Sequence, residues 1–394
     1  MLKHQSNALD VVRTTLGKIT KTKKPVSKFI IHTVELWLGM NCRYVFSNME
    51  RWGSMTEKSY RNGFKKFFDW FGFNFQLMQQ HCGEEIIAVF DPSYIKKSGK
   101  QTYGLAMFWS GVRQKALKGL EIGCLAFVDV LAATALHGVA EQTPSPKDLK
   151  AKGKTLVNHY VEVIEKHIGD IKSVTRYLAV DGYFMKKEFI HPLLQQGLHI
   201  ITKARSDANL MYVFNGKQKG GRGRRKLYDG KINVQKIDKR RLPCCYKDEH
   251  VKVYAGAVYC MLLKQIVLAA FVYYNEKEKP EIIICTDTTL KAMTMCKYYG
   301  LRFQVEFLIR DAKQHTGLED CMARDKNKLH THFNIAMTVV YIAKATYHLP
   351  IPIEQRGSFS MADIKMLHTN QLITKRIFSN LALDLSCRKI KRIL

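Results

Sequence analysis

Short runs of apolar residues, separated by polar turns, occupy the middle of the chain. A run of β-branched and aromatic residues bounded by turn formers is typical of a strand, whereas apolar residues three or four positions apart indicate a helix. The pattern predicts strands at 86–90, 102–109, 123–132, 174–180, 199–203, 251–262, 266–274 and 281–286. It predicts helices between them at 150–167 and 184–196. This order predicts an α/β fold, in which helices cover a mixed sheet.

The two ends of the chain show helical spacing instead. Residues 29–38 are amphipathic, and the segment that opens with Ser54-Met-Thr-Glu57 begins with a capping-box pattern. A long helix is predicted at 329–348, and the last forty residues are also helical in pattern. We therefore divide the chain into regions at 1–80, 81–349 and 350–394, with a β-rich insertion at about 205–286 in the second.

The charge of the chain points to a polyanionic partner. Sixty-three Lys and Arg residues against 34 Asp and Glu give a formal net charge of +29, for which nucleic acid is the simplest explanation. The longest apolar run, Val258–Tyr274, is broken by Lys264 and Gln265 and indicates two strands. We therefore expect DNA or RNA as the partner and no membrane.

The basic N-terminal region leaves two interpretations open. Its second predicted helix carries basic residues on the polar side, namely Lys58, Arg61, Lys65 and Lys66. A helix-turn-helix-like DNA reader fits this charge, and so does a helical cover whose basic face is solvated.

The cysteines and the N-terminus indicate the cytoplasm. None of the ten cysteines pairs at metal-knuckle spacing, and only Cys244 and Cys245 are adjacent. Reduced thiols are therefore expected in place of zinc or disulfides. The first residues, Met1-Leu-Lys-His-Gln-Ser, lack the apolar core of a secretion signal.

Two aspartates stand at the ends of predicted strands. Asp91 follows 86–90 and Asp181 follows 174–180, so both side chains are expected at one edge of the sheet. Each is also explained as a turn former, before Pro92 or Gly182. Asp129, inside an apolar strand, is a rival candidate, because a buried carboxylate is costly unless it is used or paired.

A stripe of four side chains follows the insertion. Tyr299, Arg302, Glu306 and Lys313 are three, four and seven positions apart, which places them on one face of a helix. A carboxylate beside a hydroxyl, a guanidinium and an ammonium suits a site for a metal ion and a phosphodiester. An ordinary helical ion pair of Glu306 with Arg310 is the alternative.

The spacing Tyr-x2-Arg-x3-Glu-x6-Lys, with aspartates after two apolar strands, resembles the insertion-sequence-four family of bacterial DDE transposases. The resemblance covers about residues 85–350. It implies a ribonuclease H-like mixed sheet flanked by helices, with the β-rich insertion before the glutamate helix. It also implies a catalytic triad of Asp91, Asp181 and Glu306 that binds two Mg²⁺ ions, for which Mn²⁺ substitutes.

The resemblance further implies cut-and-paste transposition of an insertion sequence. Such enzymes cleave DNA at terminal inverted repeats, form a hairpin intermediate and join the freed end to target DNA. Tyr299, Arg302 and Lys313 would bind phosphates beside the scissile bond. A homodimer on double-stranded DNA is expected in the bacterial cytoplasm, associated with the nucleoid, with the C-terminal helices as a candidate interface.

Some candidates remain less defined. The loop with Arg222, Arg224 and Arg225 is expected to contact the DNA backbone. By the resemblance, an aromatic residue of the insertion would hold a flipped base, and Tyr212, Phe214 and Tyr228 are candidates, although a core or strand role is the favoured interpretation for each. His330 and His332 do not face each other on a helix, so no metal role is expected. The alternatives are a catalytically inactive DNA-binding derivative and a ribonuclease H-like nuclease without strand transfer.

Overall fold

One mixed sheet runs through the computed structural model, which describes residues 7–19, 22–205, 208–218, 225–275, 277 and 279–381. The strand order is β2-β3-β1-β5-β6-β12-β11-β10-β7-β8, with β4 beside β3 and β9 beside β10. The first part of the sheet consists of the strands that precede the β-rich insertion in sequence: β1 (Ile86–Lys96), β2 (Ala106–Ser110), β3 (Lys115–Asp129), β4 (Thr134–Gln142), β5 (Tyr177–Val180) and β6 (His199–Lys203). The second part consists of the strands of the insertion: β7 (Leu210–Val213), β8 (Tyr228–Lys231), β9 (Cys244–Lys247), β10 (Val251–Cys260), β11 (Gln265–Tyr274) and β12 (Glu281–Cys285).

The first part of the sheet combines both strand directions. β3 pairs antiparallel with β1, β2 and β4, whereas β1, β5 and β6 are parallel to one another. Parallel strands need crossover connections, and helices supply them: α6 (Pro146–Ala151), α7 (Leu156–Glu165) and α8 (Ile168–Val174) precede β5, and α9 (Lys187–Gln195) precedes β6. The predicted α/β class with a mixed sheet is therefore confirmed.

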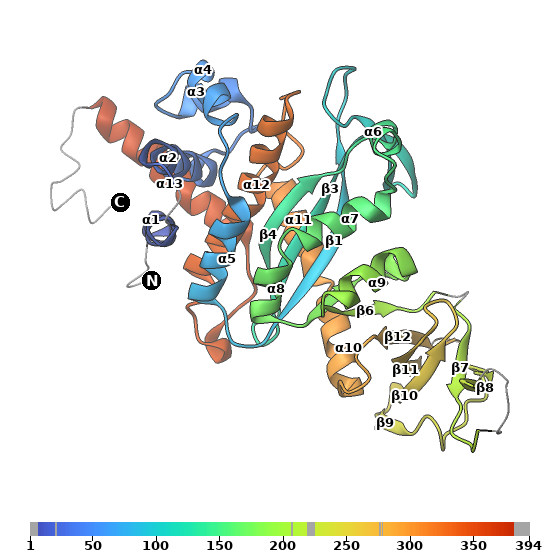
Figure 1. Cartoon of the computed structure of the whole chain (residues 1–394). Helices are drawn as coiled ribbons and strands as arrows, with labels where there is room; N and C mark the ends of the chain where they lie inside the picture. The colour runs from blue at the N-terminus through green and yellow to red at the C-terminus, as the bar shows by residue number, and fades with distance from the viewer. Residues whose placement is uncertain are drawn as a thin grey trace.

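The β-rich insertion extends this same sheet. β12 pairs antiparallel with β6, and β11, β10 and β7 follow outward (Figure 1). The register between β12 and β6 is short, from Ile283↔Lys203 to Cys285↔Ile201. The insertion is thus attached to the rest of the molecule through a strand that directly neighbours β5.

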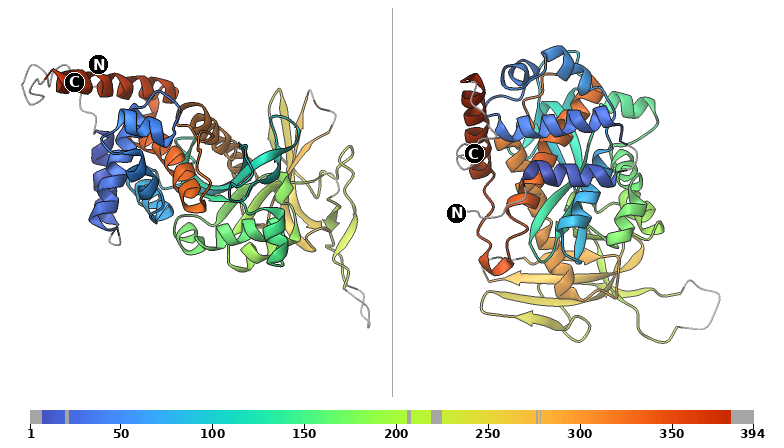
Figure 2. Two further views of the ribbon diagram at one scale, coloured as in Figure 1. Left: turned by 90° about the horizontal axis from the view of Figure 1, so that it is seen from above. Right: turned by 90° about the vertical axis from the view of Figure 1, so that its left-hand side faces the viewer.

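Helices from both ends of the chain pack together at the end of the molecule opposite the β-rich insertion (Figure 2). The N-terminal helices are α1 (Ala8–Lys18), α2 (Lys24–Gly39), α3 (Phe46–Trp52), α4 (Glu57–Gly63) and α5 (Trp70–His81), and the C-terminal ones are α12 (Lys326–Tyr347) and α13 (Met361–Asn380). α12 is buried along most of its length and contacts α1, α2, α5 and β4. The N-terminal region therefore shares one hydrophobic core with the sheet.

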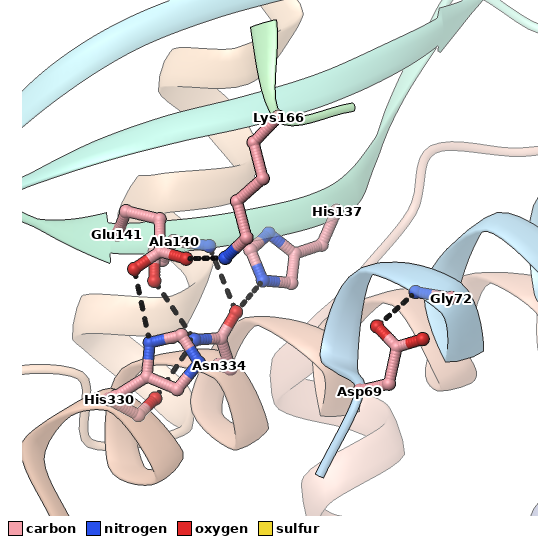
Figure 3. A network of polar contacts seen from close by, with 8 residues as sticks. All are labelled: Asp69, Gly72, His137, Ala140, Glu141, Lys166, His330 and Asn334. Carbon is pink, nitrogen blue, oxygen red and sulfur yellow. Dashed lines mark hydrogen bonds and ion pairs between the residues drawn. The ribbon is translucent and has the colours of Figure 1, made fainter. Parts of the chain in front are cut away.

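A polar network joins α12 to β4 inside this core (Figure 3). The Asn334 side chain accepts from Ala140 N at 2.9 Å, donates to Ala140 O at 2.9 Å and lies 3.1 Å from His137 Nε2. Beside it, Glu141 accepts from Lys166 Nζ at 3.0 Å and faces His330 Nδ1 at 3.5 Å. Because buried polar groups are costly when unpaired, this network fixes the register of α12 on the sheet.

A buried lysine ties the last described helix to the second. Lys365 of α13 donates from Nζ to the carbonyl oxygens of Trp37, Leu38 and Met40 at 2.7, 2.8 and 2.5 Å. These carbonyls lie at the C-terminal end of α2, where helical carbonyls lack partners within the helix. In the described part of the chain, no helix is long and apolar enough to cross a membrane.

Several predicted boundaries are wrong for identifiable reasons. The helix predicted at 150–167 is broken between α6 and α7, where Gly153 has a φ of +64°. The helix predicted from Ser54 begins later, because Thr56 is the N-cap and accepts from Ser59 N. Strand β4 was not predicted, because His137 and Glu141 interrupt its apolar pattern. The strand predicted from Val174 begins at Tyr177, after α8.

Candidate active site

Asp91 and Asp181 are neighbours because of the register between two parallel strands. Phe90 of β1 pairs with Val180 of β5, the last pair of that ladder. The next residue of each strand is the aspartate, and adjacent strands lie about 4.8 Å apart. The two carboxylates therefore start from adjacent backbone positions at one edge of the sheet.

The prediction that Asp91 ends its strand is wrong. β1 continues through Pro92 to Lys96 by pairing with β3. Proline is tolerated here because β5 pairs only with Ala88–Phe90, so β1 has a neighbour on one side only beyond that point. Asp181 does follow its strand, and its Oδ1 accepts from Gly182 N at 2.6 Å.

Glu306 reaches the same edge from helix α11 (Gln304–His315), which packs against β1. Arg302 links it to the sheet: its Nη2 lies 3.3 Å from Glu306 Oε1 and its Nη1 lies 3.8 Å from Asp91 Oδ1. Asp91, Asp181 and Glu306 all line one cavity of about 1620 Å³. The structure thus brings the three predicted carboxylates to one site.

The stripe of four side chains lies on two helices where one was expected. α10 (Ala292–Leu301) ends just before Arg302, and α11 begins after Phe303. Both linking residues keep helical backbone angles, so Tyr299 and Arg302 still face each other, with the guanidinium carbon 5.7 Å from the ring centre. The short junction preserves the predicted common face.

Lys313 anchors the far end of α11. Its Nζ donates to the backbone carbonyl of Tyr94 at 2.7 Å and lies 3.4 Å from Glu319 Oε1. Tyr94 belongs to β1, three residues after Asp91. Lys313 therefore holds α11 against the strand that carries the first carboxylate, and it also lines the cavity.

Burial and neighbouring carboxylates both make the ionised form of Asp91 costly. Burial raises the pKa of Asp91 to about 7, Arg302 opposes this, and the charges of Glu306, Asp181 and Glu121 add to the rise. A carboxylate that is costly to ionise among other carboxylates is stabilised by a cation. This is the electrostatic condition expected at a site for a divalent metal ion.

Glu121 is a fourth acidic residue of the cavity, which the sequence analysis did not identify. It lies buried on β3, and its Oε1 accepts from Tyr160 OH at 2.6 Å and from Thr143 Oγ1 at 2.9 Å. Burial raises its pKa. The signal that singled out Asp129, a carboxylate inside an apolar strand, applies equally to Glu121.

Asp129 lies away from the site. It pairs with Ile86 at the opposite end of the β1–β3 ladder, five residues from the Asp91↔Cys124 pair. Its carboxylate accepts from the backbone N–H groups of Gly83, Leu131 and Ala132 at 2.8–3.0 Å. The rival candidate therefore stabilises the β3–β4 turn.

The donor set fits a hard divalent cation, because Mg²⁺ prefers carboxylate oxygens. Asp91, Asp181 and Glu306 supply only oxygen and share one cavity. Among the described residues, no three His, Cys, Asp or Glu side chains lie close enough together to hold one metal ion. In this arrangement Arg302 provides the positive charge that faces Asp91 and Glu306.

The candidates in the insertion have separate positions. Arg222 and Arg224 lie outside the described residues, and Arg225 is exposed. Each aromatic candidate contacts its own neighbours: Tyr212 OH accepts from Asp238 N, Lys226 lies over Phe214, and the ring of Tyr228 packs at a tilt against that of Tyr259. His330 faces Glu141, and His332 lies 2.8 Å from Gly317 O, so the two imidazoles contact different partners.

Comparison with protein families gives one match. Residues 153–342 match the family model described as the transposase DDE domain. This range contains Asp181, Glu306 and the whole β-rich insertion, and it begins after Asp91. No curated protein matches the chain. The match supports a transposase of the DDE type, a class of enzyme that acts on DNA and generally uses divalent metal ions.

Proposed function

We propose that this chain is a cut-and-paste DNA transposase of the insertion-sequence-four type, with Asp91, Asp181 and Glu306 as its catalytic triad. The register that ends at Phe90↔Val180 is the observation that carries this proposal, because it makes the two aspartates adjacent. The core around β1, β3, β4, β5 and β6 is proposed to be ribonuclease H-like. The mixed sheet and the family match at 153–342 support this assignment.

The chemistry of the site follows from its charges. Two Mg²⁺ ions, with Mn²⁺ as a substitute, would activate the attacking oxygen and neutralise the leaving one. Asp91, Asp181 and Glu306 are the residues proposed to hold them. Arg302 and Lys313 fix Glu306 and α11 relative to β1 through the contacts described above. With Tyr299, they are also proposed to bind phosphates beside the scissile bond.

The proposed substrate is double-stranded DNA that carries terminal inverted repeats, followed by target DNA. A net charge of +29 supports a polyanionic partner. Arg222, Arg224 and Arg225 are proposed to contact the backbone. The basic N-terminal helices are proposed to contribute to DNA binding, and the C-terminal helices to a homodimer on DNA. A cytoplasmic, nucleoid-associated protein is the corresponding proposal for localisation.

The test is cleavage of DNA that contains the inverted repeats flanking the coding region. We expect cleavage only with Mg²⁺ or Mn²⁺, and we expect Asp91→Ala, Asp181→Ala and Glu306→Ala each to abolish it while DNA binding persists. Asp129→Asn, which alters a buried carboxylate of β3 opposite the start of β1, is the matched control and should cleave. An active Asp91→Ala enzyme together with an inactive Asp129→Asn enzyme would overturn the assignment.

The products separate this function from its alternatives. A transposase that uses a hairpin intermediate yields a covalently closed end on a denaturing gel, followed by joining to a second DNA. A nuclease without strand transfer gives nicked or cut ends only. A catalytically inactive derivative binds the repeats and leaves them intact at every metal concentration.

A further inference from the structure

One part of the active-site cavity is lined by apolar and basic side chains, in contrast to the edge that carries the carboxylates. Its walls are the β2–β3 hairpin on one side and the segment from Pro144 to Leu156 on the other. We call this part the hairpin arm. The residues that line it are Met107, Phe108, Trp109, Ser110, Gly111, Val112, Arg113, Leu117, Pro144, Pro146, Leu149, Lys150, Gly153, Lys154, Thr155 and Leu156. Among these lining residues none is acidic, whereas the other end of the cavity holds Asp91, Asp181 and Glu306.

The hairpin arm presents large apolar side chains to solvent. Along β2, Phe108 and Ser110 are buried, whereas Met107 and Trp109 are 57% and 58% exposed. Val112, in the turn that follows, is 93% exposed. Exposed apolar side chains that gather in one place mark binding surfaces. Trp109 contributes little to the packing of β2, because the buried side chains of this strand lie on its opposite face.

Positive charge accompanies this apolar surface. Arg113 and Lys150 line the arm, and neither has a carboxylate partner among the described residues, whereas Lys154 pairs with Glu162 at 2.5 Å. A cavity lined by an exposed aromatic side chain and by cations without carboxylate partners complements a polyanion whose apolar faces are accessible. Single-stranded nucleic acid has this character, because its bases stack on aromatic rings while cations follow the backbone. In a duplex the same faces are hidden by stacking.

We propose that the hairpin arm binds unpaired nucleotides of the DNA strand that enters the active site, with Trp109 stacking on a base and Arg113 and Lys150 contacting phosphates. This inference rests on the proposed function in taking DNA as the ligand. It adds a single-strand subsite at the β2–β3 hairpin, outside the carboxylates, outside the α10–α11 stripe and outside the β-rich insertion. The subsite favours DNA whose ends are already melted or cut.

The experiment measures DNA binding without divalent metal, so that cleavage does not contribute. The probes are a fluorescein-labelled oligothymidine of about twelve nucleotides and a duplex of the same length. We expect Trp109→Ala to weaken binding of the oligothymidine by about five-fold or more, as loss of one base–aromatic stack predicts. We expect its duplex binding to change by less than about two-fold, and Trp109→Phe to retain most of the single-strand affinity.

Leu131→Ala is the matched control, because Leu131 is also an exposed apolar residue, at 68%, in the turn at the other end of β3. It should bind both probes as the wild type does. Unchanged oligothymidine binding by Trp109→Ala, or an equal loss for both probes, would overturn the subsite. A change of oligomeric state in Trp109→Ala with single-strand binding intact would also overturn it, and would identify the surface as a contact between copies.

The two proposals fail in different ways. If the transposase assignment is wrong, the wild type binds the oligothymidine through Trp109 and yet never cleaves repeat DNA with Mg²⁺. If the subsite is wrong, the wild type cleaves with Mg²⁺ and the Trp109→Ala protein binds single strands with full affinity.

Discussion

Arg302 Nη2 lies 3.3 Å from Glu306 Oε1, across the junction between α10 and α11. The same guanidinium reaches Asp91, and only 12% of the arginine side chain is exposed. Lysine would keep the charge but lose the planar fork that spans both carboxylates. We therefore predict that Arg302→Lys lowers the metal-dependent cleavage rate by about 10- to 100-fold, the range typical of residues that orient metal ligands.

The measurement is the cleavage rate as a function of Mg²⁺ concentration. Arg310→Lys is the control, because Arg310 lies on α11 one turn after Glu306, lines the cavity and pairs with Asp311. It should change the rate by much less. Equal rates for Arg302→Lys and the wild type would show that the bridge has no role in ordering the carboxylates.

Asp129→Ala should cost stability and leave the chemistry intact. The substitution removes the acceptor for three backbone N–H groups at the β3–β4 turn. The three donors are only partly buried, so each costs less than the roughly 1–3 kcal/mol of a fully buried unsatisfied donor, and a total loss of roughly 2–4 kcal/mol in the free energy of unfolding is expected. Urea unfolding measures it, and cleavage assays at low temperature check activity. A stable but inactive variant would contradict this structural role.

Lys365→Met should loosen α13 from the rest of the molecule. The methionine fills a similar volume but removes the ammonium that donates to the carbonyls of Trp37, Leu38 and Met40. Among the described residues, Leu38 O then has no other donor, and the other two carbonyls keep only the Tyr44 hydroxyl. We expect a loss of about 3 kcal/mol in the free energy of unfolding. We also expect faster proteolysis within α13.

Lys375→Met serves as the comparison for this lysine. Lys375 lies on the same helix but forms an exposed pair with Glu35 at 3.1 Å. Its removal should change stability by less than about 1 kcal/mol. Similar effects of the two substitutions would mean that the three carbonyl contacts do not stabilise the docking of α13.

Acid should destabilise the fold through buried neutral histidines. Burial lowers the pKa of His137 to about 3 and that of His332 to about 4, from an ordinary value of 6.5. Between pH 6.5 and 4 the unfolded chain therefore binds protons that the folded chain does not, so stability falls as the pH falls. His332 alone contributes about 3 kcal/mol to this loss by pH 4.

Urea unfolding at several pH values tests this dependence. His332→Gln should reduce the slope of stability against pH by about 1 kcal/mol per pH unit in that window. His250→Gln, at an exposed position, should keep the wild-type slope. An unchanged slope in His332→Gln would contradict a neutral, buried imidazole that donates to Gly317 O.

Local spacing was enough to predict part of the site. The common face of Tyr299, Arg302 and Glu306 depends on helical periodicity, which survives the two-residue junction at Arg302. Asp181 was predicted from the end of its apolar run, and β5 does end before it. Both inferences use only residues that are close in sequence.

Other features depend on pairing between distant segments. That Asp91 neighbours Asp181 follows from a ladder between residues about ninety positions apart, and the continuation of β1 past Pro92 depends on β3. The distance of Asp129 from the candidate site follows from the register between β1 and β3, which pairs Asp129 with Ile86. Glu121 shows a limit of another kind, because its donors, Tyr160 and Thr143, come from elements whose positions the sequence pattern does not specify.

Strand β6 lies between the β-rich insertion and the strand that precedes Asp181. On one side Thr202 Oγ1 donates to the carbonyl oxygen of Asp181 at 2.9 Å, and on the other Thr202 pairs with Ile284 of β12. One residue of β6 therefore contacts both the adjoining strand of the insertion and the backbone of a candidate metal ligand. The insertion and the Asp181 backbone are thus placed relative to each other by one continuous sheet.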